Sequence, residues 1–291
     1  MVKALLKSMR PRQWPKNAVV LAAVVFDRQL SLHDPLPLLR SLLGLVLFCL
    51  LSSSIYIIND LVDIEADRAH PVKCNRPIAS GKLPIPIAIV AAVGILLVTF
   101  PISFMLSPGF FFITVIYFLE NLAYSNWLKH IPLIDVLMIA LGFVLRVGGG
   151  VSIIEVQRFS PWLYVVITLG ALYIGFGKRR AELTLLADNA QSHRRVLNGY
   201  NIPLLDQLIT IVSSSTILTY SLYTFSAPNL PNNHLMMLTI PFVLYGVFRY
   251  LFLIQIKKAG GAPEELLLLD RPLQVTIFLW GLSIILIFYI F

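Results

Sequence analysis

Long apolar stretches, separated by short polar segments, make up most of the chain. A helix that crosses a bilayer needs about 20 mostly apolar residues, because its backbone hydrogen bonds must all close within the helix. Proline and glycine punctuate the breaks between the stretches. The pattern predicts nine spans, the first of them short, at residues 17–32, 36–58, 84–106, 109–126, 131–153, 161–176, 204–225, 235–256 and 273–291. We therefore expect a single all-α domain, residues 1–291, built as a bundle of about nine transmembrane helices.

The composition supports this prediction. Hydrophobic residues make up 57% of the chain and charged residues only 13%, whereas a soluble domain typically carries about 25% charged residues. The two cysteines lie in an apolar run and in a basic loop, which indicates neither a disulfide nor a metal–thiolate site. No small-residue cleavage site follows the basic N-terminal segment, so we expect this segment to remain attached.

The distribution of Lys and Arg predicts the orientation. If the N-terminus is cytoplasmic, the outer loops carry only Arg28, Arg40 and Arg158, and nearly all other basic residues lie in inner loops. This asymmetry satisfies the positive-inside rule with the C-terminus outside. The net charge of +8 therefore reflects topology and does not indicate a nucleic-acid partner. We expect a multi-pass protein of the cell (inner) membrane.

An acidic motif at the cytoplasmic end of the second predicted span carries the first candidate chemistry. Asn59 precedes Asp60, Asp63 and Asp67, whose spacing places all three carboxylates on one face of a continuous helix. Three carboxylates on one face repel one another unless a cation lies between them, and Mg²⁺ prefers such oxygen ligands. The alternative, that they only cap and solubilise a helix end, explains a single Asp better than three.

A basic loop, residues 68–82, follows the acidic motif and contains Lys73 and Arg76. Carboxylates and cations in one site suit a polyphosphate, which Mg²⁺ would bridge to the carboxylates on one side while Arg or Lys binds it on the other. His70 in the same loop is expected to be solvated. We expect this site to open toward the cytoplasm.

At these residues the chain resembles the UbiA superfamily of intramembrane prenyltransferases. That family has nine membrane helices and an N-D-x-x-D-x-x-x-D motif after the second helix, which the segment 59–67 matches completely. Segments 10–17, 76–79, 124–129 and 177–183 more specifically resemble its decaprenyl-phosphate phosphoribosyltransferase branch. The resemblance implies transfer of phosphoribose from phosphoribosyl diphosphate to a polyprenyl phosphate lipid in the bilayer, with Mg²⁺ as cofactor. The product would serve cell wall biosynthesis.

One departure from the wider family bears on the substrates. Aromatic prenyltransferases usually carry a second Asp-rich motif after the fourth helix, but segment 124–135 offers Tyr124, Lys129 and only one carboxylate, Asp135. One acidic cluster can serve one Mg²⁺–diphosphate, while a second phosphate bound by Lys and Tyr needs no metal. This favours the phosphoribosyl branch. Prenyl transfer to an aromatic acceptor stays open, as does, more remotely, a secondary transporter. Tyr124 and Lys129 are also typical interfacial anchors.

The resemblance and the charges together define the candidate residues. The metal ligands are expected to be Asp60, Asp63 and Asp67, and the catalytic residues Asp60, Asp63 and Lys129. Substrate binding is assigned to Lys16, Asn59, Lys73, Arg76, Tyr124, Asp135, Arg146, Lys178 and Arg179. The run 178–180 is equally typical of topology, and Glu182 is expected to pair with Arg179 or Arg180.

Arg146 and Arg249 lie inside predicted spans and must face the interior or a wet cavity. We expect Arg146 to pair with Asp135 or a backbone carbonyl. In the last cytoplasmic loop, acidic and basic residues suggest a lid, formed by Glu264, Glu265, Asp270 and Arg271. A homo-oligomer stays open.

Overall fold

The computed structural model describes residues 1–31, 33–154, 156, 160–187, 195–227, 230–231, 233–257, 266 and 269–290. All regular elements within these residues are helices, which confirms the predicted all-α class. Backbone contacts divide the chain into two compact units. Unit 1 comprises Met1–Val24, Gln29–Asn126 and Leu145–Val156, and unit 2 comprises Val25–Arg28, Trp127–Val144 and Gln157–Phe291. The single domain over 1–291 stays a prediction.

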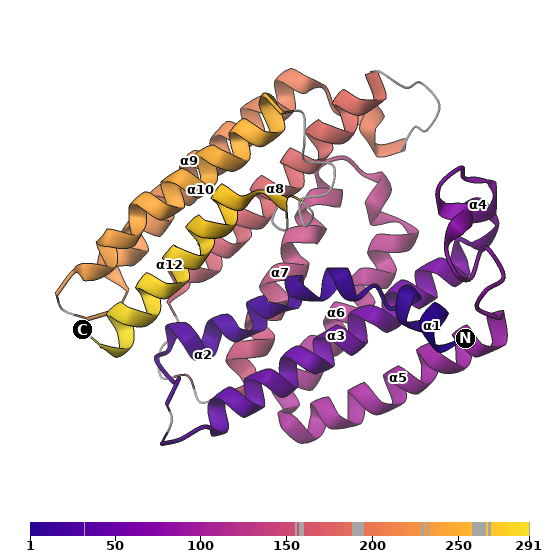
Figure 1. Ribbon diagram of the computed structural model, residues 1–291, viewed down its shortest axis with the longest axis horizontal. Coiled ribbons are helices and arrows are strands. Elements are labelled where there is room, and N and C mark those ends of the chain that lie inside the picture. The colour runs from indigo at the N-terminus through magenta and orange to yellow at the C-terminus, as the bar shows by residue number, and fades with distance from the viewer. Residues whose placement is uncertain are drawn as a thin grey trace. The chain divides into compact units, whose positions relative to one another are not determined.

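Unit 1 is built on two long helices, α3 (Leu36–Val62) and α5 (Ile85–Leu106), which run side by side (Figure 1). Its other elements are α1 (Val2–Ser8), the 3-10 helix η1 (Pro11–Leu21), α4 (Ile64–Ala69), the short 3-10 helix η2 (Lys73–Asn75) and α6 (Pro108–Asn126). Buried aliphatic residues of α3, α5 and the loop between them form a core at Ile57, Ile78, Leu83, Ala88 and Ala92. This core supports the end of α3 that carries the acidic motif.

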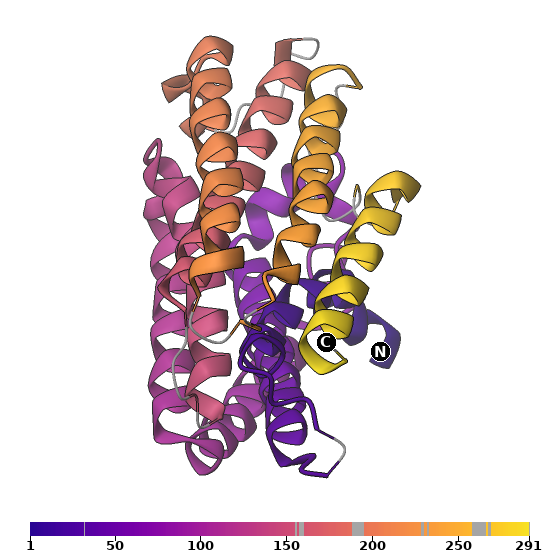
Figure 2. The same ribbon diagram turned by 90° about the vertical axis from the view of Figure 1, so that its left-hand side faces the viewer.

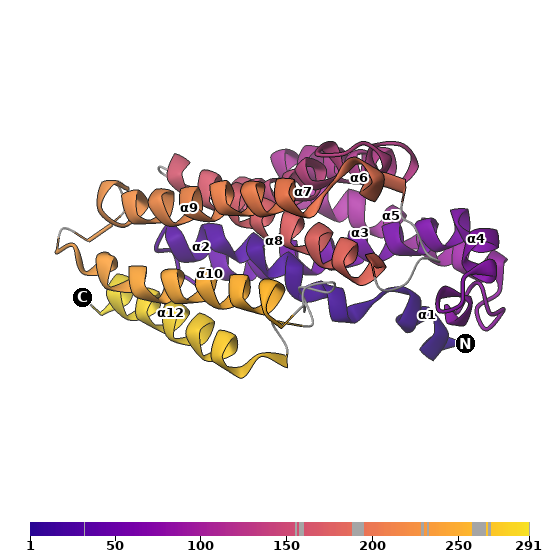
Figure 3. The ribbon, with the colours of Figure 1, turned by 90° about the horizontal axis from the view of Figure 1, so that it is seen from above.

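Unit 2 contains four long helices, α8 (Pro161–Ala187), α9 (Ile202–Ser226), α10 (Ile240–Gln255) and α12 (Arg271–Tyr289). Figures 2 and 3 both show α10 beside α12, and α10 also packs against α8 and α9. Three 3-10 helices complete the unit: η3 (Leu128–His130), η4 (Arg195–Gly199) and η5 (Leu235–Thr239). Its largest core centres on Tyr173, Leu205, Ile209 and Tyr250. Two helices, α2 (Ala22–Phe26) and α7 (Ile134–Ile153), contribute residues to both units.

Seven helices of the described residues are long and apolar enough to cross a membrane, so the predicted count of nine is not confirmed. They are Leu36–Val62, Ile85–Leu106, Ile134–Ile153, Pro161–Thr184, Ile202–Ser226, Leu235–Gln255 and Arg271–Tyr289. Predicted span 109–126 is helical as α6, but Glu120 and Asn121 make it less apolar. Predicted span 17–32 instead contains the end of η1 and the five-residue α2. Pro15 within η1 lacks the N–H that a regular α-helix would use there.

Candidate functional site

The acidic motif does not lie on one continuous helix, so this part of the prediction is wrong. Helix α3 ends at Val62, and Asp63 adopts φ −90° and ψ 11° before α4 begins at Ile64. Aspartate is a poor helix-interior residue because its short side chain competes for backbone hydrogen bonds. Asp60 and Asp67, on either side of the break, are each 2% exposed, whereas Asp63 is half-buried.

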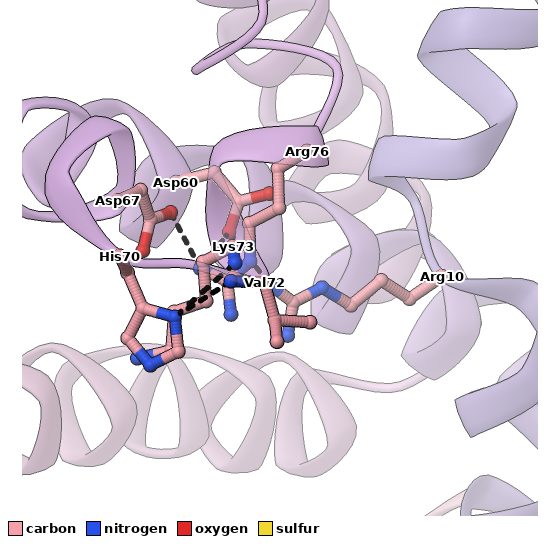
Figure 4. Close-up of polar contacts among 7 residues, drawn as sticks. All are labelled: Arg10, Asp60, Asp67, His70, Val72, Lys73 and Arg76. Atoms are coloured by element: carbon pink, nitrogen blue, oxygen red, sulfur yellow. Dashed lines mark hydrogen bonds and ion pairs between the residues drawn. The ribbon is translucent and has the colours of Figure 1, made fainter. Parts of the chain in front are cut away.

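Arg76 joins the two buried carboxylates (Figure 4). Its Nη1 donates to Oδ2 of Asp67 at 2.6 Å and to Oδ1 of Asp60 at 3.1 Å. Arg10 approaches the same Asp60 oxygen from α1's end, with its Nη2 at 2.5 Å and its guanidinium 4.9 Å from the centre of the Tyr56 ring. Because a buried charge is tolerated only when it is paired, these two arginines are what allows the carboxylates to be buried.

Arg10 is a site residue that the sequence did not single out, although it lies in one of the segments that carry the resemblance. Its backbone is left-handed, with φ 52° and ψ 61°, which is uncommon for a residue other than glycine. The signal in the sequence was the following Pro11, which disfavours the right-handed helical region for the residue before it. The backbone therefore turns between α1 and η1 where the guanidinium meets Asp60.

The carboxylate pair fits a divalent cation, though with fewer ligands than predicted. No group of three or more His, Cys, Asp or Glu in the described ranges is arranged to hold a metal ion. Asp60 and Asp67 nevertheless bring oxygens to one guanidinium nitrogen, so the two carboxylates converge on a single cation. Mg²⁺ commonly uses only one or two protein carboxylates and completes its octahedron with water and substrate phosphate. The pair matches that requirement.

The two predicted substrate-binding cations of the basic loop differ in exposure. Arg76 turns inward to the aspartates, whereas Lys73 is exposed. His70 closes the intervening turn, since its Nδ1 accepts hydrogen bonds from the backbone N–H groups of Val72 at 3.1 Å and Lys73 at 3.3 Å (Figure 4). His70 is half-buried, and these local hydrogen bonds, which lie at the exposed side of the loop, fix its ring.

Arg146 is buried, at 7% exposure, as predicted for a cation inside a span. Its Nε donates to Oδ1 of Asn17 at 2.7 Å, and its Nη2 donates to the Tyr117 hydroxyl at 2.6 Å. The predicted partner Asp135 pairs instead with Arg179. Through these two hydrogen bonds, Arg146 ties η1 and α6 to α7 within unit 1.

A second buried cluster lies in unit 2 around Asp135, which is fully buried in the first turn of α7. The Tyr200 hydroxyl donates to its Oδ1 at 2.6 Å and accepts from the Leu133 backbone N–H at 2.6 Å. Arg179 places Nε 2.8 Å from Oδ2 of Asp135, an ion pair without hydrogen-bond alignment. Arg179 also donates to Glu182, which confirms one of the predicted pairings.

The remaining predicted site residues are spread over both units. In unit 1, half-buried side chains come from η1, α3 and α6, namely Lys16, Asn59 and Tyr124. In unit 2, half-buried lysines come from η3 and α8, namely Lys129 and Lys178. Arg180, next in the basic run, pairs with Asp206 at 2.5 Å. The basic run is thus divided between one accessible cation and two paired ones.

Arg249, which was expected to face the interior or a wet cavity, forms an ion pair with Asp270, with its Nη2 2.8 Å from Oδ2 of the carboxylate. Asp270 also accepts from the Leu273 backbone N–H at 3.0 Å and so caps α12. The guanidinium beside it lowers the pKa of this carboxyl below its ordinary value. Glu264 and Glu265, the other acids of the predicted lid, lie outside the described residues.

An apolar cavity of about 270 Å³ lies among α8, α9, α10 and α12. Its lining includes Tyr173, Tyr250, Thr216 and Thr276, each of which donates its hydroxyl to a backbone carbonyl. With these hydroxyls satisfied inside the protein, the cavity suits a hydrocarbon and not a phosphate.

Comparisons with known proteins show to which family the chain belongs. The UbiA prenyltransferase family profile matches residues 18–282. Decaprenyl-phosphate phosphoribosyltransferase of Corynebacterium glutamicum is 33% identical over 98% of this chain and 87% of its own length, and that of Mycolicibacterium smegmatis is 35% identical over 96% and 91%. A UbiA homologue from Archaeoglobus fulgidus, solved with GPP and Mg²⁺, aligns with a TM-score of 0.73 at 17% identity, covering 99% of this chain and 100% of that one. With its apolar helices, the chain is a multi-pass membrane protein that belongs to the UbiA prenyltransferase family.

Proposed function

We propose that this chain is a membrane enzyme that transfers 5-phosphoribose from phosphoribosyl diphosphate to a polyprenyl phosphate and releases diphosphate. The observation that carries the proposal is the buried Asp60–Arg76–Asp67 cluster with Arg10, which combines carboxylates for a cation with guanidinium groups for phosphate. The full-length relatives that bear this activity in their names support the same reaction.

The donor diphosphate belongs at the acidic cluster of unit 1. Asp60 and Asp67, with Asp63 beside them, would hold Mg²⁺, which when bound supplies Lewis-acid stabilisation of negative charge on the leaving diphosphate. Arg76 already reaches both carboxylates and Arg10 reaches one, so both guanidinium groups lie where diphosphate oxygens would bind. We assign the neighbouring polar residues Asn59, Lys73 and Lys16 to the same substrate.

The acceptor phosphate requires cations but no metal. In the reaction, the bond from ribose C1 to diphosphate breaks with its electron pair on diphosphate, and an acceptor phosphate oxygen forms the new bond to C1. A phosphate monoester is anionic near neutral pH, so no strong general base is needed. We assign Lys129 and Lys178 of unit 2 to orienting this phosphate, and positioning of the two substrates supplies most of the catalysis. The apolar cavity of unit 2 supports a lipid acceptor.

We further propose that the site opens toward the cytoplasm of a cell inner membrane, with the N-terminus cytoplasmic. The support is the concentration of Lys and Arg in the predicted inner loops. Phosphoribosyl diphosphate carries several negative charges and cannot cross a bilayer unaided, so its site must face the compartment that contains it.

The test is transfer of label from [¹⁴C]phosphoribosyl diphosphate into organic-extractable lipid by purified protein supplied with polyprenyl phosphate. We expect label in the lipid phase with Mg²⁺ and none with EDTA. Asp60→Asn should abolish transfer, while Asp34→Asn, which removes an exposed carboxylate of unit 1, should not. Label transfer by Asp60→Asn at the wild-type rate would refute the assigned donor site. Absence of transfer by wild type, together with transfer of a labelled prenyl diphosphate to an aromatic acceptor, would establish the alternative.

A further inference from the structure

Three segments of unit 2 meet at one buried hydroxyl group, that of Tyr200. Tyr200 follows η4, accepts from the Leu133 N–H in the turn before α7, and donates to Asp135 in the first turn of α7. Asp135 in turn faces Arg179 of α8 at 2.8 Å. A single side chain therefore connects the η4 segment, the start of α7 and, through one carboxylate, helix α8.

The turn that Tyr200 contacts is held tightly and under strain. Leu133 has φ 68°, a strained conformation that a residue other than glycine keeps only where its surroundings enforce it. The adjacent Gly199 lies so close to Pro132 that a Cβ on the glycine would be 2.2 Å from the proline Cγ. Residues 199–200 thus fix the path of residues 132–133.

Burial separates the members of this cluster from the lysines beside them. Asp135 is 0% exposed and Arg179 is 1% exposed, so neither side chain offers a surface to a substrate. Lys178, next to Arg179, and Lys129, six residues before Asp135, are both half-buried. The buried pair therefore anchors the two backbone segments from which the accessible lysines project.

The hydroxyl of Tyr200 is suited to a fixed role. Burial and the hydrogen bond to Asp135 raise its pKa, so it keeps its proton and remains a donor to the carboxylate. With one donated and one accepted hydrogen bond, both short at 2.6 Å, it satisfies a buried backbone N–H and a buried carboxylate oxygen together.

We propose that Tyr200 is a positioning residue that, through Asp135 and Arg179, fixes Lys129 and Lys178 relative to each other as the two cations of the acceptor phosphate site. The inference rests on the proposed function. It also reassigns Asp135 and Arg179 from substrate binding to support, because they form an ion pair with each other and are 0% and 1% exposed. Loss of the hydroxyl should let the two lysines separate, which weakens binding of one phosphate bound by both.

The test compares Tyr200→Phe with Tyr220→Phe in purified full-length protein. Tyr220 is a matched control in the same unit: its hydroxyl is also buried and bonded to two partners, Thr239 and Trp280. For Tyr200→Phe we expect the KM for polyprenyl phosphate to rise about tenfold, with the KM for phosphoribosyl diphosphate and kcat within about twofold of wild type. Tyr220→Phe should match wild type in all three constants.

Asp135→Asn provides a second variant if Tyr200→Phe does not elute as a single species, since it keeps the acceptor for Tyr200 but removes the charge that holds Arg179. It should show the same selective rise in acceptor KM. An equal change in both KM values, a fall in kcat alone, or the same result for Tyr220→Phe would overturn the proposal. Failure of wild type to transfer phosphoribose would instead refute the proposed function, so the two failures are distinct.

Discussion

Replacing Arg76 with glutamine tests whether its guanidinium is the shared cation of the acidic cluster. The side chains of Asp60 and Asp67 are 2% and 3% exposed, and Arg76 is the residue that contacts both. Arg76→Gln keeps a polar side chain but removes the charge. Two buried carboxylates would then face each other, with Arg10 still beside Asp60.

The expected cost follows from the burial of the partners. Breaking a buried ion pair by removing one member costs about 3–5 kcal/mol, whereas an exposed pair is worth about 0–1 kcal/mol. Arg76 is itself 28% exposed, and Arg10 still compensates Asp60, so water and the second arginine reduce the penalty. We expect Arg76→Gln to lower the free energy of unfolding by roughly 2–3 kcal/mol.

The assay is thermal unfolding of purified protein in detergent micelles, with and without Mg²⁺. Arg12→Gln is the control, because it removes an exposed guanidinium of the same unit and should change stability by less than about 0.5 kcal/mol. Mg²⁺ should restore much of the stability of Arg76→Gln, since a ligand at 100 times its Kd stabilises the folded state by about 2.7 kcal/mol. The wild type should gain less, because its carboxylates already have a cation.

Two results would refute this reasoning. If Arg76→Gln unfolds at the wild-type temperature without Mg²⁺, the guanidinium is not what compensates the buried carboxylates. If Mg²⁺ stabilises wild type and Arg76→Gln equally, the ion does not bind at the position that Arg76 shares with Asp60 and Asp67.

Two further predictions concern unit 2. Gly175→Ala should lower the unfolding temperature, because the new Cβ would lie 2.6 Å from Cγ1 of Val136. Gly170→Ala on the same helix is the control: its Cβ meets no heavy atom within 4 Å, so it should stabilise α8 by about 0.5–1 kcal/mol. Equal unfolding temperatures for the two variants would contradict the close packing of Gly175 against Val136. Arg249 lowers the folded-state pKa of Asp270 below 3.8, so their pairing contributes stability above that pH and loses it as pH falls through the folded value. Asp270→Asn, which keeps the helix cap, should therefore lose less stability than wild type as the pH falls below about 5. Parallel dependences of stability on pH for the two proteins would show that the ion pair does not stabilise the fold.

Local features of the site followed from the sequence because they join residues close in the chain. Asp60 lies at the end of α3, Asp67 lies on α4 and Arg76 lies in the loop that follows, so the sequence already placed these three charges close together in the chain. The break in the helix at Asp63 could not be predicted from the sequence, because helix propensity gives only a weak preference for one conformation over another. That break decides which two of the three carboxylates share a cation.

The helical class and most of the apolar spans follow from the amino-acid sequence, since a chain with so few charged residues must satisfy its backbone within helices. The long-range partners became visible when the chain was folded: Arg10 for Asp60, 50 positions away, and Tyr200 for Asp135, 65 positions away. Apolar periodicity shows that a helix is buried but not which polar group of another segment will lie beside it. Those pairings arise from how the helices pack, where each buried charge or hydroxyl must find a partner within hydrogen-bonding distance.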